Sequence, residues 1–301
     1  MRFVTFSKDG AARAGVLVGD ASRTTDSVFD LAADAMAAAL GGVEPQVGRL
    51  VDAGLDRIVA SITRHGLREE ARFSLGDVSL LAPIPRPRRI IGIAHNYRDA
   101  IRERGIEPPS APVVFIKHSE TVIGPNVPVR LPAGIGGVTY EAELAVVIGK
   151  SGRNIELADA LSHVVAAATI NDVSASELIK KDGNFDRGKN FPTFGPFGPY
   201  LATVDEVGDL QRLAVHFEME GVTLQDSNTA QMLFPVAELI AILSRDGPLE
   251  VGDVIATGTP AGVAAVRKPP TWLRPGTKMQ ASVERLGTLS NPIIEGEPFS
   301  G

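Results

Sequence analysis

Cysteine is absent from this sequence, and histidine is scarce, with five in 301 residues. The lack of cysteine excludes disulfide bonds, thiolate metal sites and cysteine nucleophiles. A metal bound by this chain would therefore need oxygen or imidazole ligands.

Long apolar runs and dense basic stretches are also missing. One of the longest apolar runs, Val164–Ile170, is too short to span a bilayer, and the first residues do not have the pattern of a signal peptide. The 30 basic and 36 acidic residues give a formal net charge of -6, and no basic stripe indicates nucleic-acid binding. We therefore expect a cytoplasmic protein that binds neither nucleic acid nor membrane.

Residues 1–80 have the pattern of a small α/β domain. Two β-type runs and two helical patterns are predicted there, at Arg2–Phe6, Ala14–Val18, Leu31–Leu40 and Val47–Ile62. The next segment, Leu81–Arg88, contains three prolines and suits neither a central strand nor a helix interior. We place a domain boundary there, which leaves residues 81–301 as the second domain.

The second domain is rich in short β-type runs between Gly and Pro turns. These runs are Arg89–Ala94, Val113–Ile116, Glu141–Ile148, Val164–Asn171, Leu213–Met219, Asp253–Thr257 and Lys278–Val283. Few helical patterns interrupt them, Val236–Ser244 being the best. This favours an α+β, β-rich fold with a mixed β-sandwich or roll, and argues against a doubly wound parallel sheet.

Two glutamates share one face of a predicted strand. Glu141 and Glu143 are two residues apart, and side chains at that spacing point the same way. Paired carboxylates repel each other and are costly to desolvate, and a divalent cation between them would remove that cost. The alternative is an edge strand with a solvated acidic face, and the pair alone favours neither.

A third carboxylate favours the metal interpretation. Asp172 follows the apolar run Val164–Asn171, where a strand end is well placed to face a cleft. The alternative is that Asp172 caps a short helix over Val173–Lys180. Three oxygen ligands suit Mg²⁺ or Mn²⁺.

Residues 186–199 are rich in Gly and Pro, which predicts a rigid, irregular loop. Arg187 and Lys189 lie in it and are candidates to bind an anionic substrate or to bridge to the carboxylates. The alternative is two exposed basic side chains on a loop.

The sequence resembles the fumarylacetoacetate hydrolase superfamily over about residues 85–295. The matching segments, in chain order, are Asn96-Tyr97, Phe115–Lys117, Tyr140–Lys150, Asn171–Val173, Arg187–Phe194, Gln231–Phe234, Pro248–Val263 and Leu286–Asn291. The resemblance implies a mixed β-roll, often in homodimers, and substrates that carry a 2-oxo or 1,3-diketo acid.

The resemblance also implies roles for particular residues. It implies Mg²⁺ or Mn²⁺ held at Glu141, Glu143 and Asp172. Lys189 and Thr193 match residues that line the metal site, and Thr259 matches a residue near the substrate carboxylate.

The chain departs from the superfamily pattern at one position. Members usually have Asn-Tyr-x-x-His-x-x-Glu, in which the His and Glu activate water, whereas here Ala100 stands at the His position and Glu103 remains. His95 or His118 is a candidate replacement base, although each also suits a plain strand end. Arg98 is a candidate for the substrate carboxylate, or lies on a solvated helix face.

Three functions follow as hypotheses. The first is a metal-dependent hydrolase that cleaves a C–C bond in an acylpyruvate or a related 2-oxo acid. The second is a decarboxylase, isomerase or hydratase of the same superfamily, which the loss of the His favours. The third is a catalytically quiet protein that binds a metal and a ligand.

Overall fold

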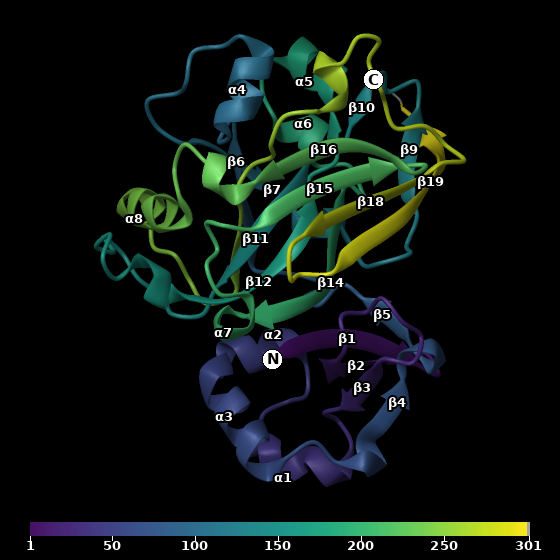
Figure 1. Cartoon of the computed structure of the whole chain (residues 1–301), viewed down its shortest axis with the longest axis vertical. Coiled ribbons are helices and arrows are strands. Elements are labelled where there is room, and N and C mark those ends of the chain that lie inside the picture. The colour runs from purple at the N-terminus through teal and green to yellow at the C-terminus, as the bar shows by residue number, and fades with distance from the viewer. Residues whose placement is uncertain (300–301) are drawn as a thin grey trace.

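Residues 1–299 are described by the computed structural model, in which two mixed β-sheets dominate (Figure 1). The larger sheet contains β1 (Arg2–Lys8), β2 (Ala11–Val18), β3 (Ser27–Asp30), β4 (Arg72–Ser74), β5 (Ser79–Leu81), β6 (Arg89–Ala94), β7 (Val113–Lys117), β8 (Val122–Ile123), β11 (Ala142–Ile148), β12 (Val164–Asn171), β14 (Gly195–Thr203) and β17 (Asp253–Ala256). The smaller sheet contains β9 (Val129–Ala133), β15 (Ala214–Met219), β16 (Val222–Asn228), β18 (Lys278–Val283) and β19 (Thr288–Pro298). A separate pair is formed by β10 (Val138–Thr139) and β13 (Ser174–Ala175).

The helices are short. They are α1 (Ala37–Leu40), α2 (Val47–Asp52), α3 (Leu55–His65), α4 (Arg98–Arg104), α5 (Ser176–Asp182), α6 (Asp186–Lys189), α7 (Val204–Val207) and α8 (Val236–Asp246). No helix within residues 1–299 combines the length and the apolar character needed to cross a membrane.

The two sheets pack face to face. The larger sheet has the order β4-β3-β2-β1-β14-β12-β11-β17-β6-β7, and the smaller one the order β16-β15-β18-β19-β9. Strands β11 and β12 contact β18, and the apolar side chains of Leu144, Val146 and Phe217 lie in the shared core. Burial of each such side chain contributes about 1.5–3 kcal/mol. The α+β, β-rich class is confirmed.

The amino-terminal segment continues the larger sheet. Strand β1 pairs with β14 in antiparallel register, with Phe3 opposite Leu201. Helices α1 to α3 lie with β1 to β5 at one end of the molecule (Figure 1). Besides the core between the two sheets, a second apolar cluster contains Val16 and Leu50 from this end together with Ala168 of β12. The division at residues 80 and 81 stays a prediction.

Two helix predictions near the amino terminus are partly wrong. The predicted helix 31–40 is reduced to a 3₁₀ turn, Asp34–Met36, and the single α-turn α1, which ends before the left-handed Gly41. The predicted helix 47–62 is broken into α2 and α3 at Gly54, whose φ of 91° is unsuited to a helix.

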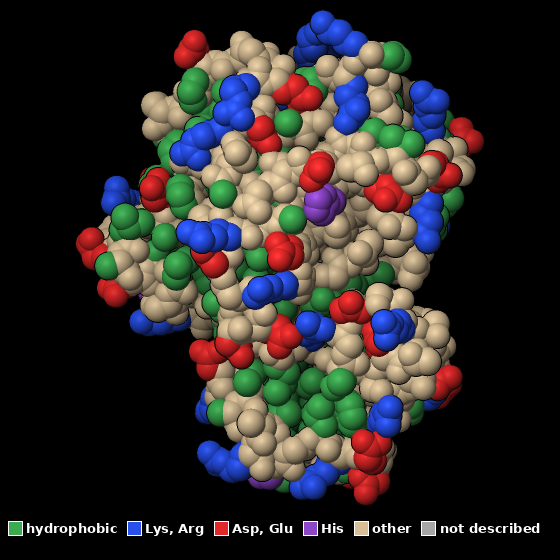
Figure 2. All heavy atoms as spheres, viewed as in Figure 1, with side chains coloured by type: hydrophobic (Ala, Val, Ile, Leu, Met, Phe, Trp, Pro, Cys, Tyr) green, Lys and Arg blue, Asp and Glu red, His purple; other side chains and the backbone are tan. Residues whose placement is uncertain are grey.

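The predicted irregular loop 186–199 is also partly wrong, because it contains α6 and most of β14. The predicted helix 173–180 begins later, at Ser176. The strand predictions at 89–94, 164–171 and 278–283 are confirmed without change. Basic and acidic side chains are interspersed over the face of the molecule in Figure 2.

Candidate functional site

The structure brings together the three carboxylates of the predicted metal site. Glu141 immediately precedes β11, Glu143 lies within it, and Asp172 immediately follows β12. These two strands are antiparallel neighbours, and the Asp172 amide donates to the Glu141 carbonyl oxygen over 2.9 Å. One oxygen from each carboxylate lies within 4.8 Å of the other two.

Two buried lysines face this carboxylate cluster. Lys189 Nζ lies 2.8 Å from Glu141 Oε2 and 2.5 Å from Asp172 Oδ2. Lys117 Nζ lies 2.8 Å from Asp172 Oδ1. The helix-capping alternative for Asp172 is therefore excluded, since its carboxylate bonds to the lysines and α5 has no side-chain cap.

Lys117 is a residue whose role the sequence analysis missed. It appeared only as part of a matching segment, yet its side chain is 1% exposed. The signal was the alternation in β7, where Phe115 and Lys117 are buried while Val114 and Ile116 are exposed. A lysine at an inward position needs a carboxylate partner, which identifies it as part of a charged site.

The charges in the cluster shift one another's pKa values. Burial raises the pKa of Glu143 well above its usual range, and the negative charges of Asp172 and Glu141 add to this effect. Burial also acts to raise the pKa of Asp172, but Lys117 and Lys189 outweigh it and lower that pKa. Burial opposes the charge of Lys189, yet the nearby carboxylates raise its pKa and keep it protonated.

The cluster fits a hard divalent cation. Three carboxylates face two ammonium groups, so one negative charge is left over, and Glu143 is 2% exposed. Glu143 accepts a hydrogen bond from the Gly258 amide over 2.8 Å, and among residues 1–299 it has no cationic side chain within ion-pair distance. Carboxylate oxygens are the ligands that Mg²⁺ and Mn²⁺ prefer, and a cation would offset the cost of burying Glu143.

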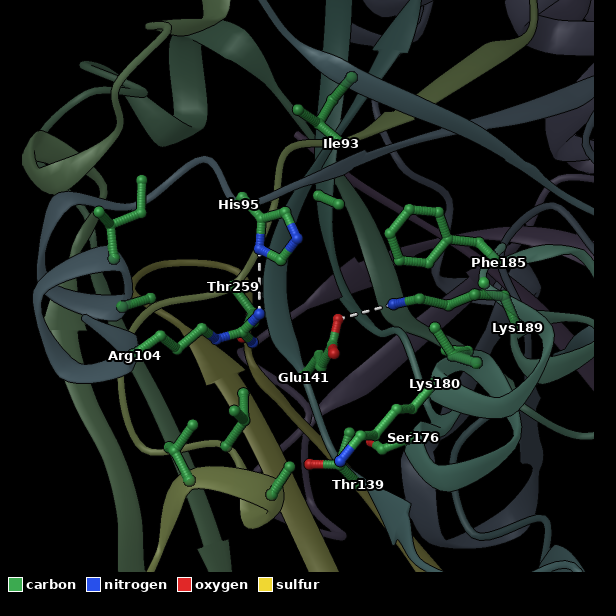
Figure 3. A pocket seen from close by; sticks show the side chains of 18 residues that line it. Ile93, His95, Arg104, Thr139, Glu141, Ser176, Lys180, Phe185, Lys189 and Thr259 are labelled. Atoms are coloured by element: carbon green, nitrogen blue, oxygen red, sulfur yellow. Dashed lines mark hydrogen bonds and ion pairs between the residues drawn. The ribbon is translucent and has the colours of Figure 1, made fainter. Parts of the chain in front are cut away.

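A pocket of about 430 Å³ opens beside the cluster. Its lining includes His95, Ala100, Arg104, Glu141, Lys180, Lys189 and Thr259. In Figure 3, Lys189 lies on one side of Glu141 and Arg104 on the other. Thr259 donates its hydroxyl to the Ala142 carbonyl over 3.0 Å and accepts from Gln225 over 2.8 Å.

His95 lies on the pocket wall, directly after β6. Its backbone has a φ of 58°, a conformation that costs energy for a residue other than glycine. Its Nδ1 lies 3.0 Å from Arg104 Nη1. Burial lowers the pKa of His95, and the charges of Arg104 and Lys189 lower it further.

The positions of the superfamily's usual acid/base pair are not assembled for water activation. Ala100 is buried on α4 and lines the pocket, but its methyl group transfers no proton. Glu103 does not line the pocket. Its carboxylate accepts a hydrogen bond from the Gly262 amide over 2.7 Å.

Four other predicted residues also do not line this pocket: Arg98, Arg187, Thr193 and His118. Arg98 donates to the Met232 carbonyl oxygen. Arg187 makes two hydrogen bonds of 2.7 Å with the carboxylate of Asp182, and its side chain is 50% exposed. The structure therefore does not place these four side chains in the pocket wall.

Comparison with known proteins identifies the family. The family model described as fumarylacetoacetate (FAA) hydrolase C-terminal matches residues 89–294. The mitochondrial oxaloacetate tautomerase fahd2 of Xenopus laevis is 43% identical over 224 residues, which cover 74% of this chain and 70% of that protein.

Solved structures agree over nearly the whole chain. A fumarylacetoacetate hydrolase from Exiguobacterium antarcticum is 32% identical with a TM-score of 0.83, covering 98% of this chain and 100% of its own. The maleylpyruvate hydrolase of Sphingobium sp. SYK-6, solved with manganese (II) and pyruvate, is 28% identical with a TM-score of 0.79, covering 99% and 100%.

These relatives are enzymes that share the mixed-sheet fold described above. The chain belongs to the fumarylacetoacetate hydrolase family.

Proposed function

We propose that this protein is a divalent-metal-dependent tautomerase that interconverts the keto and enol forms of a small 2-oxo acid. The observation that carries the proposal is the state of the two acid/base positions. Ala100 lines the pocket at the position where the superfamily pattern has a His, and Glu103 is bonded to the Gly262 amide.

Tautomerisation needs no activated water. The proton that leaves the carbon next to the keto group passes to solvent in the pocket, and solvent returns a proton to the keto oxygen. No carbon–carbon bond breaks and no water is consumed. A general base contributes ~10²–10⁴-fold, so its loss slows attack by water, whereas a keto acid polarised by a cation can still enolise with solvent as the proton acceptor.

Glu141, Glu143 and Asp172 would hold the cation. A divalent cation bound there supplies Lewis-acid polarisation of the keto group and offsets negative charge on its oxygen. Lys189 gives two of its three N–H donors to Glu141 and Asp172. The third can donate to a substrate oxygen, and its fixed positive charge stabilises the enolate.

The named relatives support the reaction class. The Xenopus laevis protein is named an oxaloacetate tautomerase. The maleylpyruvate hydrolase neighbour holds manganese and pyruvate, which supports a divalent cation and a 2-oxo acid in the present pocket. Its likeness over the full chain also makes C–C hydrolysis of an acylpyruvate a second candidate function.

The first experiment measures exchange of the C3 protons of oxaloacetate in D₂O by NMR, with Mg²⁺ or Mn²⁺ added. We expect the wild type to exceed the uncatalysed exchange rate and to lose this excess with a chelator or in Asp172→Asn. Absence of any excess exchange would refute the tautomerase proposal.

The second experiment separates the two functions with Ala100→His. We expect little acylpyruvate hydrolysis by the wild type and a gain in the variant, because the His restores a group that can accept a proton from water. Rapid hydrolysis by the wild type, at a rate comparable with its proton exchange, would instead establish the hydrolase.

A further inference from the structure

One guanidinium on the pocket wall has no carboxylate partner. Arg104 lines the pocket, and within residues 1–299 no Asp or Glu oxygen lies within ion-pair distance of it. Its Nε is buried and makes no hydrogen bond to any described residue. A buried donor of a charged group without a partner is costly, and an anionic ligand would satisfy it.

His95 holds this guanidinium in place and contributes a second donor. An arginine can only donate, so Nδ1 of His95 accepts the bond from Arg104, and the neutral ring carries its proton on Nε2. The lowered pKa of His95 agrees with a neutral ring. In Figure 3 the second ring nitrogen of His95 points away from Arg104, toward the Phe185 side of the pocket.

Helix α4 presents Arg104 and Ala100 on one face. The two residues are one turn apart, and both line the pocket. The small side chain of Ala100 leaves the space in front of the guanidinium open. In this chain the polar group on that helix face is therefore the guanidinium of Arg104, one turn beyond the position of the missing His.

Three cationic side chains line the pocket: Arg104, Lys180 and Lys189. Lys189 is neutralised by Glu141 and Asp172, whereas within residues 1–299 neither Arg104 nor Lys180 has a carboxylate within ion-pair distance. Arg104 lies on the opposite side of Glu141 from Lys189 (Figure 3). A ligand that joins the carboxylate cluster to Arg104 would thus need an anionic group at its far end.

We propose that Arg104 is a specificity-determining residue that binds the second carboxylate of a 2-oxo dicarboxylate. This inference rests on the proposed function, because it assumes that the 2-oxo acid end of the substrate lies at the carboxylate cluster. The fork of the guanidinium matches a carboxylate in two parallel hydrogen bonds.

The kinetic test compares oxaloacetate with 2-oxobutanoate, which has the same chain length and no second carboxylate. We expect Arg104→Gln to lower kcat/KM for proton exchange of oxaloacetate by about 10- to 100-fold, the usual effect of losing a hydrogen bond to a charged group. Exchange of 2-oxobutanoate should change little. Arg102→Gln is the matched control, since Arg102 is exposed on the same helix and lies outside the pocket lining.

The role of His95 as a positioning residue has its own readout. His95→Ala should raise KM for oxaloacetate by a larger factor than it raises KM for 2-oxobutanoate, because the guanidinium of Arg104 loses its acceptor. His95→Asn should restore the KM, because Asn tolerates a positive φ and offers an oxygen that accepts from Arg104.

A binding measurement separates failure of this inference from failure of the tautomerase proposal. Calorimetry of the Mn²⁺-loaded protein should give tighter binding of malate than of 2-hydroxybutanoate, and Arg104→Gln should abolish the difference. If neither 2-oxo acid exchanges protons but this preference for malate depends on Arg104, the carboxylate site stands and the tautomerase proposal fails. The carboxylate site would be overturned if Arg104→Gln lowered the affinity for malate and for 2-hydroxybutanoate equally. It would also be overturned if the variant kept the preference for malate.

Discussion

Replacing Glu143 with glutamine removes one charge from the carboxylate cluster while keeping the size of the side chain. Its oxygen can still accept from the Gly258 amide. At the 4.8 Å limit within the cluster, two unit charges repel by about 3.5 kcal/mol at an effective dielectric constant of about 20. Glu143 is repelled by the two negative charges of Asp172 and Glu141 and attracted by the one positive charge of Lys189. One repulsion between two carboxylates is therefore not offset.

Without metal, the Glu143→Gln variant should therefore be at least as stable as the wild type. The gain has an upper limit of about 3.5 kcal/mol, because the raised pKa of Glu143 lets the wild type relieve the repulsion by taking up a proton.

With metal bound, the wild type should be more stable than Glu143→Gln. A cation at about 100 times its dissociation constant stabilises a protein by about 2.7 kcal/mol. For 301 residues, an unfolding entropy of about 2.1 cal/mol/K per residue converts this into a rise in Tm of about 4 °C. Glu143→Gln should lose most of that rise, since it lacks one of the three anionic ligands.

Differential scanning calorimetry with and without Mn²⁺ measures both effects. Glu107→Gln serves as the control, because Glu107 is exposed and lies outside the cluster. An equal Mn²⁺-induced rise in wild type and Glu143→Gln would refute the metal site, and a clear loss of stability in the metal-free variant would refute the repulsion argument.

Three further predictions concern stability. Lys117→Met should lower the free energy of unfolding in urea by about 3 kcal/mol, because it leaves the buried Asp172 short of one ammonium partner. Because burial and nearby cations lower the pKa of His95 below 6.5, the unfolded chain binds the proton first. The free energy of unfolding should then fall as the pH decreases from 6.5 toward the lowered pKa, and His95→Asn should remove that part of the slope in denaturation measured across pH. Gly262→Ala should cost roughly 1–3 kcal/mol or more in thermal unfolding, since an added Cβ would lie 2.0 Å from the Leu224 carbonyl oxygen.

Much of the fold could be predicted from local pattern. Continuous apolar runs bounded by turn residues locate β6 and β12 without error, because strands buried on both faces need apolar side chains at every position. The helix predicted at 31–40 shows the limit. Its alanines favour a helix, but only one turn forms before Gly41, and Leu31 instead packs in the apolar cluster beside β1 and β2.

The candidate site was predictable where it depends on spacing. Glu141 and Glu143 lie close together because they are two residues apart beside one strand. The proximity of Asp172 to them depends on the pairing of β11 with β12, which a single sequence only suggests.

Contacts between distant segments could not be predicted. The bond between Glu103 and Gly262 joins residues 159 apart, and neither shows a local signal for it. Arg104 was not selected either, because its significance comes from its place on the pocket wall and from a buried Nε that finds no hydrogen-bond acceptor within residues 1–299. The homodimer and the cytoplasmic location stay predictions.

The pairing of β1 with β14 has a consequence for how the molecule comes apart. Phe3 of β1 lies opposite Leu201 of β14 in the sheet, and the second apolar cluster contains both Leu50 and Ala168. If residues 1–80 unfolded alone, apolar side chains of the remaining chain would be exposed to water, and the reverse is also true. Heat or denaturant should thus melt the whole molecule in a single cooperative transition, and we expect no separate transition for the residues on either side of the proline-rich segment 81–88.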